Sequence, residues 1–324
     1  MTKPDVMLLA SQRPNAMAQL EANFTLHRWD LAEDKAAILA EHGATCTAIA
    51  THGHAPVDRA MVAAMPNLKL VSCSSAGFDT FDVTALAERG VALTNTSSAL
   101  CDDVADTAIM LLLGARRGLV PGDAYVRSGS WGREGMFPLQ RSLKGRTLGI
   151  VGMGTIGQAI AHRGAAMGQT VRYWNRRPKD LPWAFEPDLI TLARDSDNLV
   201  VIVAGGEGTR NLIDASVMDA LGPDGLLINV ARGSVIDEPA MIAALSEGRL
   251  GAAALDVFEN EPNPDPRLTA LPNVTLYPHH ASGTVETRDA MAQLLVDNLG
   301  AFFAGQPLLS PVDLSAYAVR PNAT

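Results

Sequence analysis

The 324-residue sequence is poor in aromatic residues, cysteine and positive charge. Aromatic residues make up 5% of it, cysteine occurs three times, and 26 Lys and Arg face 35 Asp and Glu, which gives a net charge of −9. This acidity argues against a nucleic-acid-binding protein or a basic membrane-surface protein, because both present positive charge to phosphate. No apolar run is longer than the one at 108–113, which is far shorter than the roughly 20 residues that span a bilayer. We therefore expect no nucleic-acid partner and no membrane segment.

The three cysteines, Cys46, Cys73 and Cys101, are widely spaced and form no C-x-x-C pair that could chelate a metal or carry redox chemistry. They favour a reducing cytoplasm. The apolar run at 6–10 is too short for a secretory signal. His52 and His54 could suggest a metal, but no cysteine or carboxylate partner stands close by, so we expect no metal site.

The sequence does contain short β-branched or aliphatic runs that alternate with helical stretches. This alternation predicts parallel sheets covered by helices on both faces. The runs fall into two sets, so we expect two α/β domains. The first set lies at 6–10, 47–51, 70–74 and 91–94, and the second at 147–152, 170–174, 199–203, 226–230, 252–257 and 274–277.

Two long helices and an arm complete this outline. Acidic residues early and arginines late predict a helix over 102–119, since they complement the helix dipole. The segment 121–145 has no clear period and reads as an arm or loop, of the kind that often packs on another subunit. Its Trp131 is expected to anchor the arm. A last amphipathic helix over 284–304 is expected to return to the first domain.

The clearest motif is a strand that runs into G-x-G-x-x-G and then into a helix. Gly152, Gly154 and Gly157 occupy the glycine positions, and Thr155 and Ile156 stand at the helix start. Glycine is needed for the tight turn, for close approach to a pyrophosphate and for helix-on-strand packing. We therefore predict dinucleotide binding at this turn.

The end of the next strand reads Asn175, Arg176, Arg177 and carries no carboxylate. An acidic residue there would bind the ribose 2′-hydroxyl of NAD, whereas two guanidiniums suit a 2′-phosphate. This favours NADP(H), with NAD(H) possible. The alternative is that the two arginines only form a solvated turn.

Arg232, Glu261 and His279 stand in loops that follow predicted strands. Ligands of open α/β sheets bind beyond the carboxyl ends of the strands, so the three can converge. An arginine holds a carboxylate, a histidinium donates a proton, and a carboxylate orients and charges the imidazole. This set suits the reduction of a 2-keto acid, although each residue alone would more often be a surface charge.

Four motifs in order resemble the D-isomer-specific 2-hydroxyacid dehydrogenases, in particular their NADPH-dependent glyoxylate/hydroxypyruvate reductase branch. They are the glycine turn, Asn229-Val-Ala-Arg232-Gly, Asp256-Val-Phe-Glu-Asn-Glu261-Pro and Pro278-His279-His-Ala-Ser-Gly-Thr. The resemblance implies Arg232, Glu261 and His279 as the catalytic set, with His279 as the proton donor, and a homodimer. It also permits a second role for Trp131, which would reach toward the partner's active site. It also implies cofactor contacts at Ala204, Val230, Asp256 and Ser282, with Asp256 on the nicotinamide carboxamide.

The first domain carries the expected substrate loops. Ala76 and Gly77 occupy the place of the family's glycine-rich loop, whose amides hold the substrate carboxylate, and Ser75 replaces its first glycine. From the residues alone Gly77 would be there for a positive φ. The loop around Gly53 is the other expected wall, and Arg232 the second carboxylate contact. His280, which follows His279 in the chain, stands where the family usually has an apolar residue.

We thus predict a substrate-binding, flavodoxin-like domain at 1–98 and 285–324 and a Rossmann domain at 99–284. The predicted activity is NADPH-dependent reduction of glyoxylate or hydroxypyruvate to the D-2-hydroxy acid in an interdomain cleft. Two alternatives stay open. One is a reductase of a bulkier, phenylpyruvate-like keto acid, and the other is a non-catalytic dinucleotide sensor that resembles the corepressors of this fold.

Overall fold

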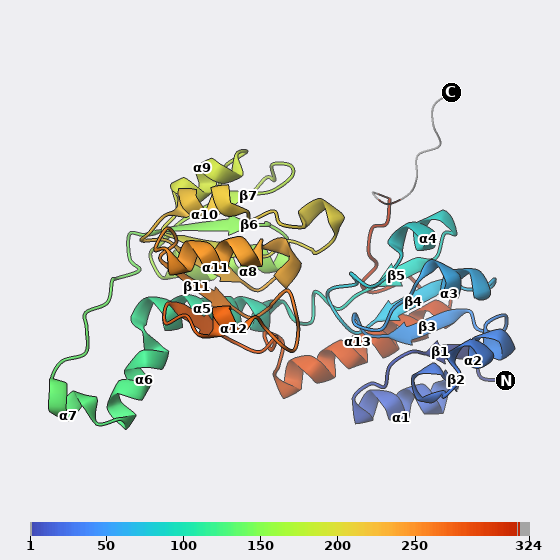
Figure 1. Ribbon diagram of the computed structural model, residues 1–324. Coiled ribbons are helices and arrows are strands. Elements are labelled where there is room, and N and C mark those ends of the chain that lie inside the picture. The colour runs from blue at the N-terminus through green and yellow to red at the C-terminus, as the bar shows by residue number, and fades with distance from the viewer. Residues whose placement is uncertain (1, 316, 318–324) are drawn as a thin grey trace. The chain divides into compact units, whose positions relative to one another are not determined.

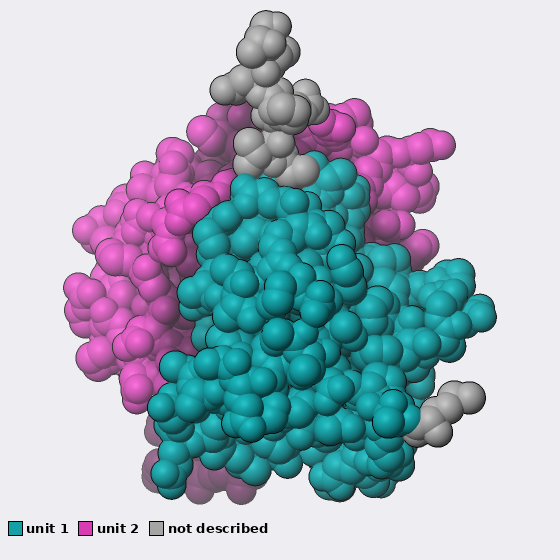
Figure 2. Space-filling view, turned by 90° about the vertical axis from the view of Figure 1, so that its right-hand side faces the viewer, with its two compact units in different colours: residues 1–100, 283–324 teal, residues 101–282 magenta. Residues whose placement is uncertain are grey.

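The structure is a computed structural model that describes residues 2–315 and 317. The chain folds into two compact units (Figure 2): residues 1–100 with 283–324 form the first unit, and residues 101–282 form the second. Each of these boundaries differs by two residues from the one expected from the sequence.

The first unit contains a five-stranded parallel sheet (Figure 1). Its order, β2-β1-β3-β4-β5, is the flavodoxin-like order, which confirms that prediction. The edge strand β2 is missing from the sequence prediction. The strands are β1 (Asp5–Leu8), β2 (Thr25–Arg28), β3 (Ala48–Thr51), β4 (Leu70–Cys73) and β5 (Ala92–Thr94); the helices are α1 (Pro14–Asn23), η1 (Trp29–Leu31), α2 (Lys35–His42), α3 (Arg59–Ala64), α4 (Val83–Glu88) and α13 (Val285–Phe303).

The last helix, α13, packs on this first sheet. Leu295 and Leu299 are fully buried in one apolar cluster with Val6 and Leu8 of β1. The buried Ser72 hydroxyl of β4 donates to the Leu295 carbonyl oxygen at 3.1 Å. The chain therefore returns to its first unit after completing the second, as the sequence predicts.

The second unit contains a seven-stranded parallel sheet with the order β12-β11-β10-β9-β6-β7-β8. When these strands are numbered 1 to 7 along the chain and the order is read from β8 to β12, it becomes 3-2-1-4-5-6-7. This is the 3-2-1-4-5-6 arrangement of a Rossmann fold with β12 as one more strand at the edge. The short β8 is absent from the sequence prediction. The strands are β6 (Thr147–Val151), β7 (Thr170–Trp174), β8 (Ala184–Phe185), β9 (Asn198–Val201), β10 (Leu226–Asn229), β11 (Ala252–Leu255) and β12 (Val274–Leu276).

Helices cover this sheet, and the segment expected to be an arm or loop is partly helical. α6 and α7 extend away from the sheet layers of their unit (Figure 1), so the arm itself is present. Gly118 immediately precedes α6 and Gly129 immediately precedes α7. Both glycines have a left-handed backbone conformation, which separates each helix from the helix before it. The helices are α5 (Cys101–Arg117), α6 (Leu119–Arg127), α7 (Ser130–Glu134), α8 (Thr155–Ala166), α9 (Leu189–Arg194), η2 (Glu207–Thr209), α10 (Ala215–Leu221), η3 (Gly233–Val235), α11 (Glu238–Ser246) and α12 (Pro266–Thr269).

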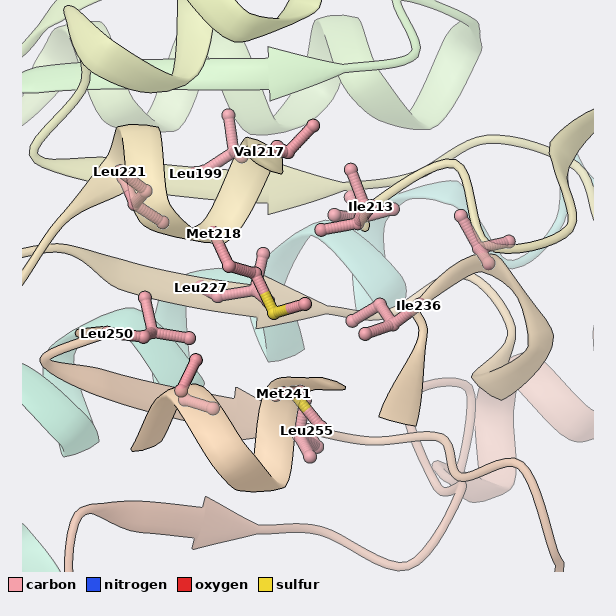
Figure 3. Packing of buried hydrophobic residues seen from close by; sticks show 14 of the residues in the cluster. Leu199, Ile213, Val217, Met218, Leu221, Leu227, Ile236, Met241, Leu250 and Leu255 are labelled. Carbon is pink, nitrogen blue, oxygen red and sulfur yellow. The ribbon is translucent and has the colours of Figure 1, made fainter. Parts of the chain in front are cut away.

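The core of the second unit lies under the strands that lead to the predicted site (Figure 3). Leu227 of β10 and Leu255 of β11 are fully buried there, together with Met218 of α10 and Met241 of α11. Burial of such side chains stabilises a domain by about 1.5–3 kcal/mol each, so this packing holds the strand ends firmly. Within the described residues, no helix is long and apolar enough to cross a membrane. The cytoplasmic location stays a prediction.

Candidate active site

The glycine turn joins β6 to α8. Gly152 has a φ of 105°, and a Cβ on it would lie 2.5 Å from the Ile202 carbonyl oxygen. A Cβ on Gly157 would lie 2.1 Å from the Gly152 carbonyl oxygen, whereas one on Gly154 would meet nothing within 4 Å. No side chain among the described residues caps α8, which leaves its first amides to an outside acceptor. The turn thus fits a pyrophosphate, which needs both free amides and room beside the backbone.

Arg176 and Arg177 follow β7 and are exposed. The Asn175 side-chain amide donates to the Arg177 carbonyl oxygen at 3.0 Å and so shapes the turn. Within the described part of the chain neither arginine forms an ion pair. Both guanidiniums are therefore available to an anion at the carboxyl end of β7.

Three neighbouring parallel strands deliver Arg232, Glu261 and His279. β10 pairs with β11, and β11 pairs with β12. Each of the three residues lies in the segment after the carboxyl end of one of these strands. Because parallel strands end at the same edge, the three loops meet on one side of the second unit, as the sequence predicts.

Glu261 and His279 form a close pair. The Oε2 atom of Glu261 lies 2.5 Å from Nδ1 of His279. Burial acts to raise the pKa of Glu261, but hydrogen bonds from His279 and the Phe258 amide, together with the charge of Arg232, leave this pKa below its ordinary value. Glu261 is therefore ionised at neutral pH. As a carboxylate it accepts the hydrogen bond from Nδ1 of His279 and so fixes the orientation of the ring.

The backbone of His279 is held in an unusual conformation by Asp256. His279 has a φ of 48°, a region that non-glycine residues rarely occupy. The carboxylate of Asp256, 1% exposed, accepts the amides of His280 at 2.7 Å and Ala281 at 3.1 Å, and its carbonyl oxygen accepts the His279 amide at 2.7 Å. Burial raises the pKa of Asp256, against the lowering effect of the two amides. This loop-holding role is absent from the sequence prediction.

The structure distinguishes the two adjacent histidines. The ring of His280 is exposed and lies edge-on to Tyr277, with the ring centroids 6.1 Å apart. Glu261 bonds to the ring of His279 and not to that of His280. The side-chain geometry therefore places His279 in the pair, as the sequence predicts.

The predicted substrate loops of the first unit are joined by the serine that replaces a family glycine. The Gly53 amide donates to the Ser75 hydroxyl at 3.0 Å, and a Cβ on Gly53 would lie 2.2 Å from the Gly77 carbonyl oxygen. Gly77 itself does not have a positive φ, so that prediction is wrong; close packing against Gly53 constrains the loop instead. Within the described residues the amides of Ala76 and Gly77 donate to no acceptor, which leaves them available to an anion.

Comparison with known proteins agrees with this geometry. Residues 109–281 match the model of the D-isomer specific 2-hydroxyacid dehydrogenase NAD binding domain. The chain is 45% identical over 295 residues to a glyoxylate/hydroxypyruvate reductase of Arabidopsis thaliana, which covers 91% of this chain and 94% of that one. The chain belongs to the D-isomer specific 2-hydroxyacid dehydrogenase family. The family predicted from the four motifs is thus confirmed, and the protein is an NAD(P)-dependent oxidoreductase.

Two further relatives of this dehydrogenase cover almost the whole chain. A 2-ketogluconate reductase of Gluconobacter oxydans is 42% identical over 312 residues, which are 96% of this chain and 99% of that one. A solved structure of an NADPH-dependent glyoxylate/hydroxypyruvate reductase from Sinorhizobium meliloti, in complex with NADP and malonate, is 41% identical. It has a TM-score of 0.89 and covers 99% of this chain and 100% of that chain.

The Glu261–His279 pair makes a prediction about the protonation of Glu261. The hydrogen bond and charge of His279 lower the pKa of Glu261, so His279→Ala should raise that pKa above its wild-type value. A carbon NMR titration of the Glu261 carboxyl group measures it. His280→Ala removes the adjacent ring, which is not bonded to Glu261, and is the matched control. An unchanged titration of Glu261 in His279→Ala would mean that the pair does not stabilise the carboxylate in solution.

Proposed function

We propose that the enzyme uses NADPH to reduce a small 2-keto acid, glyoxylate or hydroxypyruvate, to the D-2-hydroxy acid. The observation that carries this proposal is the 2.5 Å contact between Glu261 and His279 at the edge of the sheet where the glycine turn also lies. A charged imidazole beside a nicotinamide site is a proton donor suited to a carbonyl that receives a hydride. The names of the relatives support the substrate class.

Each residue of the site has a separate role in the proposed reduction. When bound, the reduced nicotinamide supplies a hydride to the keto carbon. His279 donates the Nε2 proton to the keto oxygen, which becomes the hydroxyl. Glu261 holds Nδ1 and stabilises the charged ring before the proton leaves. Arg232 binds the substrate carboxylate with its fork of N–H donors.

The cofactor would be held by the second unit. The amides at Gly154 to Gly157, including Thr155 and Ile156, would bind the pyrophosphate, and Asn175, Arg176 and Arg177 the 2′-phosphate. Asp256 keeps unused lone pairs for the nicotinamide carboxamide, although both its carboxylate oxygens already accept backbone amides. The remaining proposed contacts are Ala204, Val230 and Ser282.

The first unit would hold the substrate carboxylate with the amides of Ala76 and Gly77. Gly53 is also proposed to bind substrate, but its amide is already bonded to Ser75. Its contribution is therefore to the shape of the loop. The 2-ketogluconate reductase among the relatives favours a bulkier keto acid as the second candidate function.

A substrate panel with both cofactors, run on paired histidine variants, tests the reaction. His279→Ala should lower kcat for glyoxylate or hydroxypyruvate by roughly 10²- to 10⁴-fold, because the proton donor is lost, while NADPH binding changes little. His280→Ala is the control and should keep most of the activity. Failure of the wild type to oxidise NADPH with any keto acid would favour a non-catalytic dinucleotide sensor. A large loss of kcat in His280→Ala but not in His279→Ala would contradict the choice of His279 as the proton donor.

The cofactor preference has its own test. The double variant Arg176→Ser with Arg177→Ser should lose roughly 10- to 100-fold in kcat/KM for NADPH, because hydrogen bonds between charged groups are removed. The value for NADH should change little. Arg194→Ser, an exposed arginine at the end of α9, is the matched control. An unchanged NADPH/NADH ratio would leave the arginines as a solvated turn.

We also propose a homodimer built on the second unit. A hollow of about 700 Å³ on this unit is lined by apolar side chains of α5, among them Met110 and Leu113, and by residues of α6 and α8, with charged residues also present in its lining. The arm of this unit exposes further apolar side chains. Among them is Trp131, which is 64% exposed and is therefore not buried against its own chain. One unit thus carries both a hollow and apolar groups to fill it, which suits a symmetric pair of identical chains.

Leu113→Asp tests this dimer, because a charge in the hollow opposes its burial. Light scattering on the wild type should give the mass of two chains, and the variant should shift toward the mass of one. Ile190→Asp, an exposed apolar position on α9, should leave the mass unchanged. A monomeric wild type would refute the dimer.

A further inference from the structure

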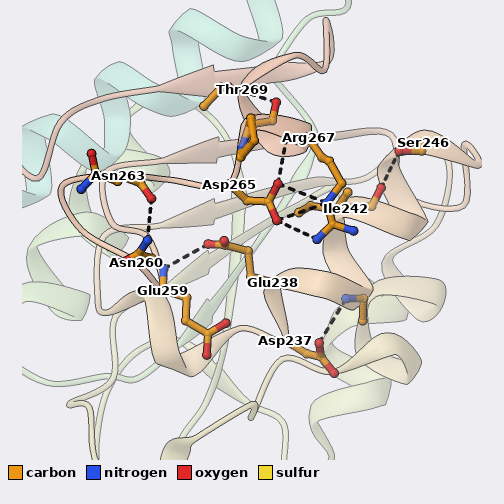
Figure 4. A network of polar contacts seen from close by, with 12 residues as sticks. Asp237, Glu238, Ile242, Ser246, Glu259, Asn260, Asn263, Asp265, Arg267 and Thr269 are labelled. Carbon is orange, nitrogen blue, oxygen red and sulfur yellow. Dashed lines mark hydrogen bonds and ion pairs between the residues drawn. The ribbon is translucent and has the colours of Figure 1, made fainter.

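Glu238 is a buried carboxylate that the chemistry above does not use. It is the first residue of α11 and only 6% exposed. Its Oε2 atom accepts the backbone amide of Glu259 at 3.0 Å (Figure 4). Glutamate is almost never so buried without a partner, because the charged form loses hydration. Its position therefore calls for an explanation.

Stabilising its own helix does not explain this burial. An acidic residue in a first turn favours the helix dipole, but an exposed one does so equally well. The N-terminal amides of α11 already have an acceptor, since Asp237 caps the helix through the Ala240 amide. The bond of Glu238 instead runs to another segment, 21 residues further along the chain.

That segment is the loop between β11 and Glu261. Its turn is closed by Glu261, whose Oε1 atom accepts the Phe258 amide at 2.9 Å. On one side the backbone of Gly233 presses on it so closely that a Cβ there would lie 1.9 Å from the Phe258 carbonyl carbon. Glu238 holds the next amide, that of Glu259. The loop is thus fixed at two consecutive residues shortly before Glu261.

We infer that Glu238 is a positioning residue for the reaction: by holding the Glu259 amide it sets Glu261 at hydrogen-bond distance from Nδ1 of His279. The inference rests on the proposed function for its effect on turnover. Glu238 does not contact the ring, so it acts only through Glu261. Displacement of a catalytic group by about 1 Å can cost a large factor in rate, so a buried acceptor for an amide so close to Glu261 matters.

The test compares Glu238→Ala, which removes the acceptor, with Glu238→Gln, which keeps an oxygen of similar reach. For Glu238→Ala we expect the pKa of Glu261 to rise, part of the way to its value in His279→Ala, because the hydrogen bond from His279 that lowers this pKa is weakened. We expect kcat to fall roughly 10-fold, with little change in the KM for the keto acid. Glu238→Gln should bring both the pKa of Glu261 and kcat most of the way back to their wild-type values.

Ala243→Gly is the matched control, since it weakens the same helix without touching the loop. It should leave the titration of the Glu261 carboxyl group as in the wild type. The inference is overturned if the pKa of Glu261 in Glu238→Ala is the same as in Ala243→Gly. The NMR titration of the full chain does not depend on turnover, so it decides the role of Glu238 even if the wild type reduces no keto acid, a result that would refute only the proposed function.

Discussion

The parallel pairing of β10, β11 and β12 is the constraint on which the candidate site depends. Arg232, Glu261 and His279 are spread over 48 residues of the chain and come together only because three paired strands end at one edge. A shift by one residue along a strand, about 3.3 Å, exceeds the tolerance of a hydrogen bond and turns each side chain to the other face. The apolar packing beneath Leu227 and Leu255 opposes such a shift, so the core and the chemistry are physically linked.

The loops beyond the strands need separate support, because apolar packing ends where the strands end. Two buried carboxylates provide it by accepting backbone amides: Asp256 for the His279 loop and Glu238 for the Glu261 loop. A loop amide removed from water must find an acceptor, and a carboxylate is a strong one. The left-handed backbone of His279 carries a conformational cost that the three bonds to Asp256 offset.

The sequence predicts the buried strands and the glycine turn because both leave local patterns, apolar runs and glycines at required positions. β2 (Thr25–Arg28) is a partly exposed edge strand without such a run, and the glycines and Pro121 between 118 and 132 hide the period of α6 and α7. The family motifs indicate Glu261 and His279. The roles of Glu238 and Asp256 arise from contacts 21 to 25 residues apart, and no local pattern records such contacts.

The net charge of −9 would repel the anionic cofactor and keto acid of the proposed reaction, so their attraction must be local. At 0.1 M ionic strength exposed charges more than about 10 Å apart are largely screened. At short range the proposed sites hold positive or donor groups: the exposed Arg176 and Arg177, the first amides of α8, and the amides of Ala76 and Gly77, none of which amides has a side-chain or backbone acceptor outside its own helix among the described residues. The acidic surface then governs solubility, while these few groups govern where an anion binds.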